Sequence, residues 1–256
     1  MGSMIITLLT DFGTRDPYVG VMKGVLCSLA PRARLVDLTH EIPPGRIDTA
    51  AFLLSNAFGY FPKGTIHLCV VDPGVGSRRK ALVLESGGQY FVGPDNGLFP
   101  AALAGHRIER VFELTLSRVL RSKRSDTFHG RDVFAPAAAT LARGVPPNRL
   151  GHPRSSLEPG ALPTPLRTAS RWIGEILWVD RFGNLVTNLP AHLLKKGAVI
   201  KAGKRTIRKI GTHYAQVTKG GLMALPGSFG TVEVSVNGGS ASKRLGARIG
   251  TPVELR

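Results

Sequence analysis

Asp11, Asp37 and Asp72 each lie at or near the end of a short apolar, strand-like segment, and carboxylates placed in this way could do chemistry. In an open α/β sheet, ligands bind at the carboxyl ends of the strands. A carboxylate there can accept both hydrogens of a vicinal diol, such as that of a ribose. A single aspartate of this kind is more often a turn or helix-cap residue, but three at neighbouring strand ends favour a ligand site.

Two further segments concentrate reactive side chains. The segment Asp72–Arg79 is rich in glycine and arginine, but it lacks the ending of a P-loop and does not follow the G-x-G-x-x-G pattern. In the run Phe128–Asp132, His129 lies among glycine, arginine and aspartate directly before a predicted helix. A lone histidine is more often structural than reactive, so the run by itself leaves both interpretations of His129 open.

The segment Asp180–Asn184 lies between two predicted strands and places a carboxylate, an aromatic ring and an amide close together. Asp180 could hold an ammonium group, Phe182 could stack on a base, and Asn184 could read the edge of that base. The same residues also fit an ordinary hairpin turn. The sequence contains no H-x-x-x-H, no C-x-x-C and no tight histidine and cysteine cluster, so it predicts no metal site.

The chain divides into regions with different patterns. Strand-like and helix-like segments alternate over residues 4–150, which predicts an α/β domain with a largely parallel sheet. Residues 151–170 are rich in proline and have little apolar periodicity, and they are predicted to be a linker. Residues 171–256 contain short strand-like runs separated by glycines, which is typical of a small all-β barrel.

Local signals add three expectations. Asp16 and Pro17 are interpreted as the cap and the first residue of a helix. The glycine pair at 87–88 separates two strand-like runs and predicts a β-hairpin. Cys27 and Cys69 both lie in apolar stretches, and they are expected to be buried free thiols of a protein from a reducing compartment.

Composition limits the classes of function. The 256-residue chain carries 34 basic and 17 acidic side chains, a formal net charge of +17. The basic residues are spread out and lack the aromatic residues and motifs of a nucleic-acid-binding domain, so a nucleic-acid partner is not expected. No apolar run approaches the roughly 18 residues of a membrane span, and no secretory signal is visible. Together with the free cysteines, these features predict a cytoplasmic protein with no membrane partner.

Five ordered motifs resemble those of the S-adenosylmethionine (SAM) hydrolases, also called SAM hydroxide adenosyltransferases, which are related to fluorinase and chlorinase. The motifs are Thr10–Gly13 with Asp16, Asp72–Gly76, Gly93–Gly97, Phe128–Pro136 and Asp180–Asn184. The resemblance spans nearly the whole chain. It implies an α/β domain followed by a β-barrel, and a homotrimer with each site between domains of neighbouring subunits. It also implies hydrolysis of SAM to adenosine and methionine without a metal or cofactor.

The resemblance implies roles for individual residues as well. Asp72, Arg79 and His129 match the catalytic aspartate, arginine and histidine of these hydrolases. Asp11 matches the carboxylate that holds the ribose hydroxyls, and Asp180 matches the acid that binds the methionine ammonium group. The remaining substrate-binding positions are matched by Asp16, Phe182, Asn184 and Ser228.

Two alternative functions share this resemblance. One is a halide-dependent 5′-halo-5′-deoxyadenosine synthase of the same fold. The halogenases carry a tyrosine at the position of Asp72, where a carboxylate repels halide but can orient or deprotonate water, so Asp72 favours hydrolysis. Gly130 matches a position that is serine in fluorinase and glycine in chlorinase, and it does not discriminate. The other alternative is a non-catalytic protein that binds SAM or adenosine without turnover.

Overall fold

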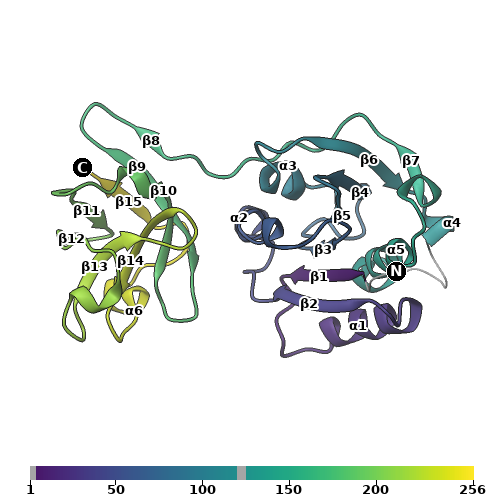
Figure 1. The fold of residues 1–256 in the computed structure, drawn as a ribbon, viewed down its shortest axis with the longest axis horizontal. Coiled ribbons are helices and arrows are strands. Elements are labelled where there is room, and N and C mark those ends of the chain that lie inside the picture. Colours follow the sequence, from purple (N-terminus) through teal and green to yellow (C-terminus); the bar gives the residue numbers. More distant parts are fainter. Residues whose placement is uncertain (1–3, 120–124) are drawn as a thin grey trace. The chain divides into compact units, whose positions relative to one another are not determined.

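A computed structural model describes residues 4–119 and 125–256, and it divides into two compact units at Leu162 and Pro163 (Figure 1). This division lies inside the segment 151–170 that the sequence predicts to be a linker. The two ends of that segment are structured, because Gly151–Pro153 is a strand of the N-terminal sheet and Leu166–Arg167 is a strand of the C-terminal one.

The N-terminal unit contains a seven-stranded sheet in the order β2-β1-β3-β5-β4-β6-β7. The strands are β1 (Ile5–Thr10), β2 (Arg34–Thr39), β3 (Ile66–Val70), β4 (Ala81–Ser86), β5 (Gln89–Pro94), β6 (Ile108–Leu114) and β7 (Gly151–Pro153). Neighbours from β2 to β5 are parallel, whereas β4, β6 and β7 pair antiparallel. The prediction of a largely parallel sheet is therefore confirmed only in part, because the sheet is mixed.

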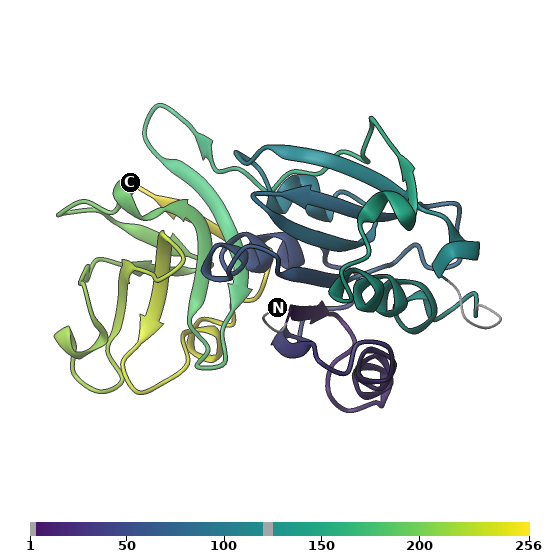
Figure 2. The ribbon, with the colours of Figure 1, turned by 45° about the vertical axis from the view of Figure 1, so that its right-hand side comes forward.

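Helices cover both faces of this sheet (Figure 2). Helices α1 (Tyr18–Leu29) and α5 (Ala135–Ala142) pack on one face, over Ile6, Leu8 and Leu68. Helices α2 (Ile47–Ser55) and α3 (Leu98–Ala102) pack on the other face, over Leu9 and Phe91. Burial of these apolar side chains stabilises the three layers and leaves the strand ends free for polar residues.

Several element ends differ from the sequence predictions. Helix α1 begins at Tyr18, and its cap position is Pro17 with no side-chain capping bond, so the predicted capping role of Asp16 is wrong. The hairpin predicted from the glycine pair is confirmed as β4–β5. Further short elements are α4 (Leu116–Val119) and a π-helix (Gly130–Phe134). Four 3₁₀ turns lie at Phe58–Tyr60, Pro147–Arg149, Ala191–Leu193 and Tyr214–Gln216.

The C-terminal unit is an antiparallel sheet in the order β12-β11-β15-β9-β10-β14-β13, with β8 paired to β9. An isolated bridge between Ile210 and Ala224 joins the chain after β12 to β13 at the opposite edge, so the sheet is nearly closed and barrel-like. Its elements are β8 (Leu166–Arg167), β9 (Trp172–Val179), β10 (Leu185–Pro190), β11 (Ile200–Ala202), β12 (Arg205–Ile207), β13 (Leu222–Pro226), β14 (Thr231–Val236), α6 (Ala241–Leu245) and β15 (Pro252–Leu255).

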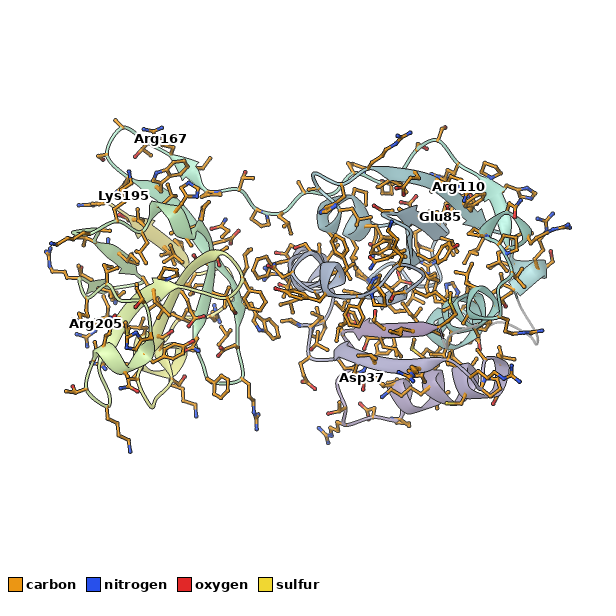
Figure 3. The ribbon with its side chains drawn as sticks, in the orientation of Figure 1. Asp37, Glu85, Arg110, Arg167, Lys195 and Arg205 are labelled. Carbon is orange, nitrogen blue, oxygen red and sulfur yellow. The ribbon has the colours of Figure 1, made fainter. Side chains whose placement is uncertain are left out.

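Basic side chains lie on the surface of the C-terminal unit, and the two cysteines of the N-terminal unit differ in burial. Arg167, Lys195 and Arg205 are exposed and project outward from the C-terminal unit (Figure 3), as expected of a solvated basic surface. Cys69 is buried in β3, but Cys27 is exposed on α1, so the prediction of two buried thiols is wrong for Cys27. Among the described residues, no helix is both long and apolar enough to cross a membrane.

Candidate active site

Three separate segments of the N-terminal unit bring Asp72, Arg79 and His129 together. Asp72 follows β3, Arg79 precedes β4, and His129 directly precedes the π-helix that leads into α5. Nε of Arg79 donates to both carboxylate oxygens of Asp72 at 3.0 Å, and Nη2 donates to Oδ2 as well. The same Nη2 lies 2.6 Å from Nδ1 of His129. One guanidinium therefore connects the acid and the imidazole.

The cluster is largely shielded from solvent. The side chains of Asp72 and Arg79 are 4% and 11% exposed, and His129 is 3% exposed. The guanidinium also lies 5.1 Å from the centre of the Phe134 ring. Because a guanidinium can only donate hydrogen bonds, Nδ1 of His129 must accept one, and a neutral His129 carries its proton on Nε2. The bidentate pairing fixes the orientation of the Asp72 carboxylate.

A glycine allows the loop between Asp72 and Arg79 to pack closely. Gly76 has φ +80°, and a Cβ atom there would lie 2.6 Å from the backbone oxygen of Asp126. A side chain at this position would be strained and would also push the loop away from the segment that carries His129. This local requirement explains the glycine at position 76.

Asp11 lies just after β1, near Asp72. Its Oδ2 accepts a hydrogen bond of 2.9 Å from the backbone N–H of Gly45. Burial raises the pKa of Asp11, two backbone hydrogen bonds lower it, and the negative charge of Asp72 raises it again, so that the pKa lies above its ordinary value. The two carboxylates at neighbouring strand ends are thus electrostatically coupled, as the sequence predicts for a shared site.

An aromatic cluster lies beside this pair. Phe12, Tyr18 and Phe128 contact one another with ring centres 5.2–5.9 Å apart. A Cβ atom at Gly130 would lie 3.0 Å from Sδ of Met22 and 3.3–3.4 Å from two of these rings. Tyr18, which is 47% exposed, was not predicted as a site residue. In the sequence, Tyr18 stands out only because it follows the Thr10–Gly13 motif closely. Asp16 is exposed in the loop before α1.

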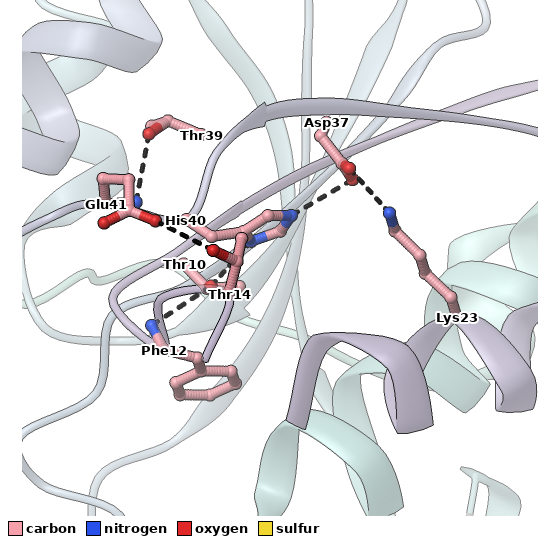
Figure 4. Close-up of polar contacts among 8 residues, drawn as sticks. All are labelled: Thr10, Phe12, Thr14, Lys23, Asp37, Thr39, His40 and Glu41. Atoms are coloured by element: carbon pink, nitrogen blue, oxygen red, sulfur yellow. Dashed lines mark hydrogen bonds and ion pairs between the residues drawn. The ribbon is translucent and has the colours of Figure 1, made fainter. Parts of the chain in front are cut away.

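Asp37 does not join Asp11 and Asp72. It lies inside β2, where Oδ2 accepts a hydrogen bond of 2.6 Å from Nζ of Lys23 and Oδ1 lies 3.1 Å from Nε2 of His40 (Figure 4). Burial would raise the pKa of Asp37, but the contacts with Lys23 and His40 outweigh it and hold the pKa below its ordinary value. Of the three strand-end aspartates, Asp11 and Asp72 therefore lie near one another and Asp37 is engaged elsewhere.

In the C-terminal unit, Asp180 closes the turn between β9 and β10. Its Oδ1 accepts hydrogen bonds from the backbone N–H groups of Phe182 and Asn184, at 2.9 and 2.8 Å. Its Oδ2 accepts a hydrogen bond of 2.8 Å from the side-chain amide of Asn184. Gly183 has φ +83°, and a Cβ atom there would overlap Ser240. The hairpin-turn interpretation is therefore correct in geometry. Phe182 is 76% exposed despite its size, so the turn presents a ring instead of burying one.

Ser228 is exposed in the turn between β13 and β14. The neighbouring Glu233 is buried, and its Oε1 accepts hydrogen bonds from Tyr214 at 2.9 Å and from Ser235 at 2.6 Å. Burial and the Glu233 charge raise the pKa of Tyr214 to about 12, and the charge of Asp180 acts in the same direction. Tyr214 and Glu233 are not among the residues predicted from the sequence, because neither lies in a recognised motif.

The described residues include no group of three or more histidine, cysteine, aspartate or glutamate side chains that could hold a metal ion. The clusters above consist instead of carboxylates, one guanidinium, one imidazole and aromatic rings. In the N-terminal unit, such side chains can hold ribose hydroxyls and can orient and deprotonate a water molecule. In the C-terminal unit, the Asp180 turn can hold an ammonium group and a base.

Comparison with known proteins agrees with these features. The family models for the SAM hydroxide adenosyltransferase N-terminal and C-terminal domains match residues 6–151 and 174–254. The chain is 43% identical to the (R)-S-adenosyl-L-methionine hydrolase of Thermus thermophilus, with 98% of both chains covered. It is 40% identical to the hydrolase of the same name from Salinispora arenicola, covering 98% of this chain and 97% of that one.

More distant relatives and solved structures complete the comparison. A fluorinase from an Actinoplanes species is 26% identical, covering 77% of this chain and 76% of its own. The crystal structure of a conserved protein from Thermotoga maritima has a TM-score of 0.90 at 35% identity and covers 98% of this chain and 99% of its own. These matches cover both units and all five sequence motifs, and the chain belongs to the SAM hydroxide adenosyltransferase family.

Proposed function

We propose that this protein hydrolyses S-adenosyl-L-methionine to adenosine and L-methionine. The observation that carries the proposal is the carboxylate of Asp72, fixed by the guanidinium of Arg79 that also contacts His129. The proposal is supported by full-length relatives that are named as hydrolases of this substrate. Asp72, Arg79 and His129 are its catalytic residues.

In the proposed reaction, a water oxygen attacks C5′ of the adenosyl group in line with the sulfonium. The C5′–O bond forms as the C5′–S bond breaks, and the electron pair of that bond stays on sulfur as the neutral thioether of methionine. One proton of the water remains in the new 5′-hydroxyl group, and the other leaves through a base to solvent. Since the leaving group needs no proton, the task of the protein is to align and deprotonate the water.

We assign the proton-accepting role to Asp72. Nδ1 of His129 already accepts a hydrogen bond from Arg79, so it cannot take a proton without breaking that contact. Arg79 orients the Asp72 carboxylate and places a positive charge beside the hydroxide that develops in the transition state. His129 then acts as a neutral donor through Nε2.

The remaining roles concern substrate binding. Asp11 binds the ribose hydroxyls and Asp180 binds the ammonium group of the methionine portion. Phe182 contacts the adenine, and Asn184 reads its edge with Oδ1, because the amide nitrogen already donates to Asp180. Ser228 lies at the methionine end, and Asp16 lies on the ligand side of the loop before α1.

Water is favoured over halide by the charge of Asp72. The Asp72 carboxylate repels an anion at the position where the halogenases have a neutral side chain. Gly130 does not separate the two reactions: a Cβ atom there would lie 3.0 Å from Met22 Sδ, but the glycine also matches chlorinase. We therefore rank halide-dependent synthesis of 5′-halo-5′-deoxyadenosine below hydrolysis.

The test is chromatography of SAM incubated with the protein in chloride-free and chloride-rich buffers, beside the variant Asp72→Ala. Equal amounts of adenosine and methionine in both buffers, lost in the variant, support the proposal. A chlorinated nucleoside would identify a halogenase instead. Unchanged SAM together with measurable SAM binding would identify a non-catalytic binding protein.

We also propose that the protein is a homotrimer in which the N-terminal unit of one subunit and the barrel of its neighbour complete each site. To test this, Asp72→Ala subunits are mixed with Asp180→Ala subunits and allowed to reassemble. Each variant alone is expected to be nearly inactive at low SAM concentration. Random mixing restores about a quarter of the sites if they form between subunits, and none if they form within one. Light scattering gives the subunit number independently.

No step of the proposed reaction uses a metal or a cofactor, and activity is expected to survive dialysis against a chelator. We place the reaction in the cytoplasm, which the two free cysteines support. Cell fractionation with an antibody against the protein tests this location.

A further inference from the structure

The Asp11 loop is joined to a second loop by contacts on both of its sides. After Asp11, the backbone N–H of Gly13 donates to the carbonyl oxygen of His40 at 2.7 Å. Before Asp11, Oγ1 of Thr10 lies 2.8 Å from Nδ1 of His40. His40, which is only 4% exposed, therefore holds the chain immediately before and after Asp11.

The His40 ring is itself fixed from its other side (Figure 4). Nε2 lies 3.1 Å from Oδ1 of Asp37, and Oδ2 of Asp37 accepts from Nζ of Lys23 at 2.6 Å. A carboxylate facing Nε2 favours the tautomer with the proton on Nε2 and leaves Nδ1 as an acceptor. Thr10 can then donate its hydroxyl proton to Nδ1 while its oxygen accepts from the Phe12 N–H, 3.3 Å away.

We propose that His40 is a positioning residue for Asp11, acting through Thr10 and Gly13, and that it sets the affinity for the adenosyl portion of the substrate. The proposal rests on the function proposed above, in which Asp11 binds the ribose hydroxyls. Among the described residues, the polar contacts of His40 go to Thr10, Gly13 and Asp37, away from the Asp72–Arg79 pair. Its loss should therefore weaken substrate binding and leave the chemical step nearly unchanged.

Two conservative variants separate the two sides of the ring. His40→Asn places a polar atom near the position of Nδ1 and retains an acceptor for Thr10. His40→Gln places its amide near Nε2, so it faces Asp37 but leaves the buried Thr10 hydroxyl without its partner. Loss of one buried hydrogen bond of this kind corresponds to about tenfold in binding. We expect His40→Gln to raise KM for SAM about tenfold at nearly constant kcat, and His40→Asn to raise it by less than about threefold.

The chain offers a matched control three residues earlier on the same strand. Oγ1 of Thr7 lies 2.8 Å from Nδ1 of His67, and both residues are fully buried among the strands. Thr7→Val and Thr10→Val remove the same hydroxyl from two equivalent pairs. We expect Thr7→Val to lower thermal stability without changing KM, whereas Thr10→Val raises KM about as much as His40→Gln.

Thr10→Val also covers the case in which His40→Gln does not fold. Unchanged KM in both His40→Gln and Thr10→Val would overturn the proposal, as would equal rises in KM for Thr7→Val and Thr10→Val. Calorimetric titration with adenosine separates it from the proposed function. If the wild-type protein does not hydrolyse SAM but Thr10→Val still weakens adenosine binding, the positioning role stands and the hydrolase function fails.

Discussion

Asp72 in the N-terminal unit and Asp180 in the barrel both lie just beyond the end of a strand, but they have different partners. The partner of Asp72 is a charged guanidinium seven residues away, which links it to an imidazole fifty residues further on. The partners of Asp180 are neutral N–H groups of its own turn. One carboxylate is held by a network of side chains, and the other is held by the backbone that carries it.

This difference fits the division of tasks proposed above. A carboxylate paired with a guanidinium has a fixed orientation, which suits taking a proton from a small molecule such as water. A carboxylate held by neutral groups keeps its full negative charge, which suits recognition of a cation such as an ammonium group. The comparison can be tested by substitutions that preserve shape and change charge.

The largest effect is expected for Asp72→Asn. The amide retains an oxygen that can accept from Arg79, but it can no longer take a proton from water, so we expect kcat to fall by about 10²–10⁴-fold with little change in SAM binding. Single-turnover kinetics and calorimetric titration measure the two quantities separately. A kcat within threefold of the wild type would show that Asp72 and Asp180 do not differ in the proposed way.

A smaller loss is expected for Arg79→Lys, with Arg78→Lys as the matched control. Lysine keeps the positive charge but cannot form the bidentate contact, and it leaves Nδ1 of His129 without its donor, so we expect kcat to fall about tenfold to a hundredfold. Arg78 is an exposed neighbour, and its substitution should leave kcat unchanged. Equal effects of the two substitutions would mean that Arg79 contributes only a general positive charge.

In the barrel, Asp180→Asn should raise KM for SAM about tenfold and leave kcat nearly constant. The amide oxygen can still accept from the backbone N–H groups of the turn, so the backbone turn is kept, while the charge for the ammonium group and the bond from the Asn184 side chain are lost. Asp180→Ala removes the turn bonds as well and should also lower the melting temperature. A fall in kcat without a rise in KM would place Asp180 among the catalytic residues.

The comparison also explains which parts of the site could be predicted from the sequence. Local patterns were sufficient for the β4–β5 hairpin and for the turn at Asp180, because glycines with positive φ and an aspartate that accepts from its own turn act within a few residues. The Asp72–Arg79–His129 cluster was predicted only through the resemblance to a family. Composition and spacing alone left His129 open, because its contact with Arg79 depends on the packing of the whole domain.

The errors have the same origin. Asp37 follows the pattern of Asp11 and Asp72, but Lys23 on α1 and His40 after β2 compete for its oxygens. The expected largely parallel sheet holds only in part, because the strand β6, which was not predicted, pairs antiparallel with β4 and β7. Lys23 and the partner strand β4 come from segments outside the local pattern, which a reading of neighbouring residues cannot include.

The smallest expected effect concerns the coupling between Asp11 and Asp72. Burial is the main cause of the raised pKa of Asp11, and the charge of Asp72 adds to it. In its proposed role, Asp11 must be ionised to accept both ribose hydroxyls, so adenosine binding should weaken as the pH falls through this pKa. Asp72→Asn removes the nearby charge and should move that acid limb to lower pH, whereas Asp180→Asn should leave it in place. Calorimetric titration with adenosine across the acid range measures the shift. An unmoved limb in Asp72→Asn would mean that the carboxylates act independently, and that the N-terminal unit does not hold its acids as one network.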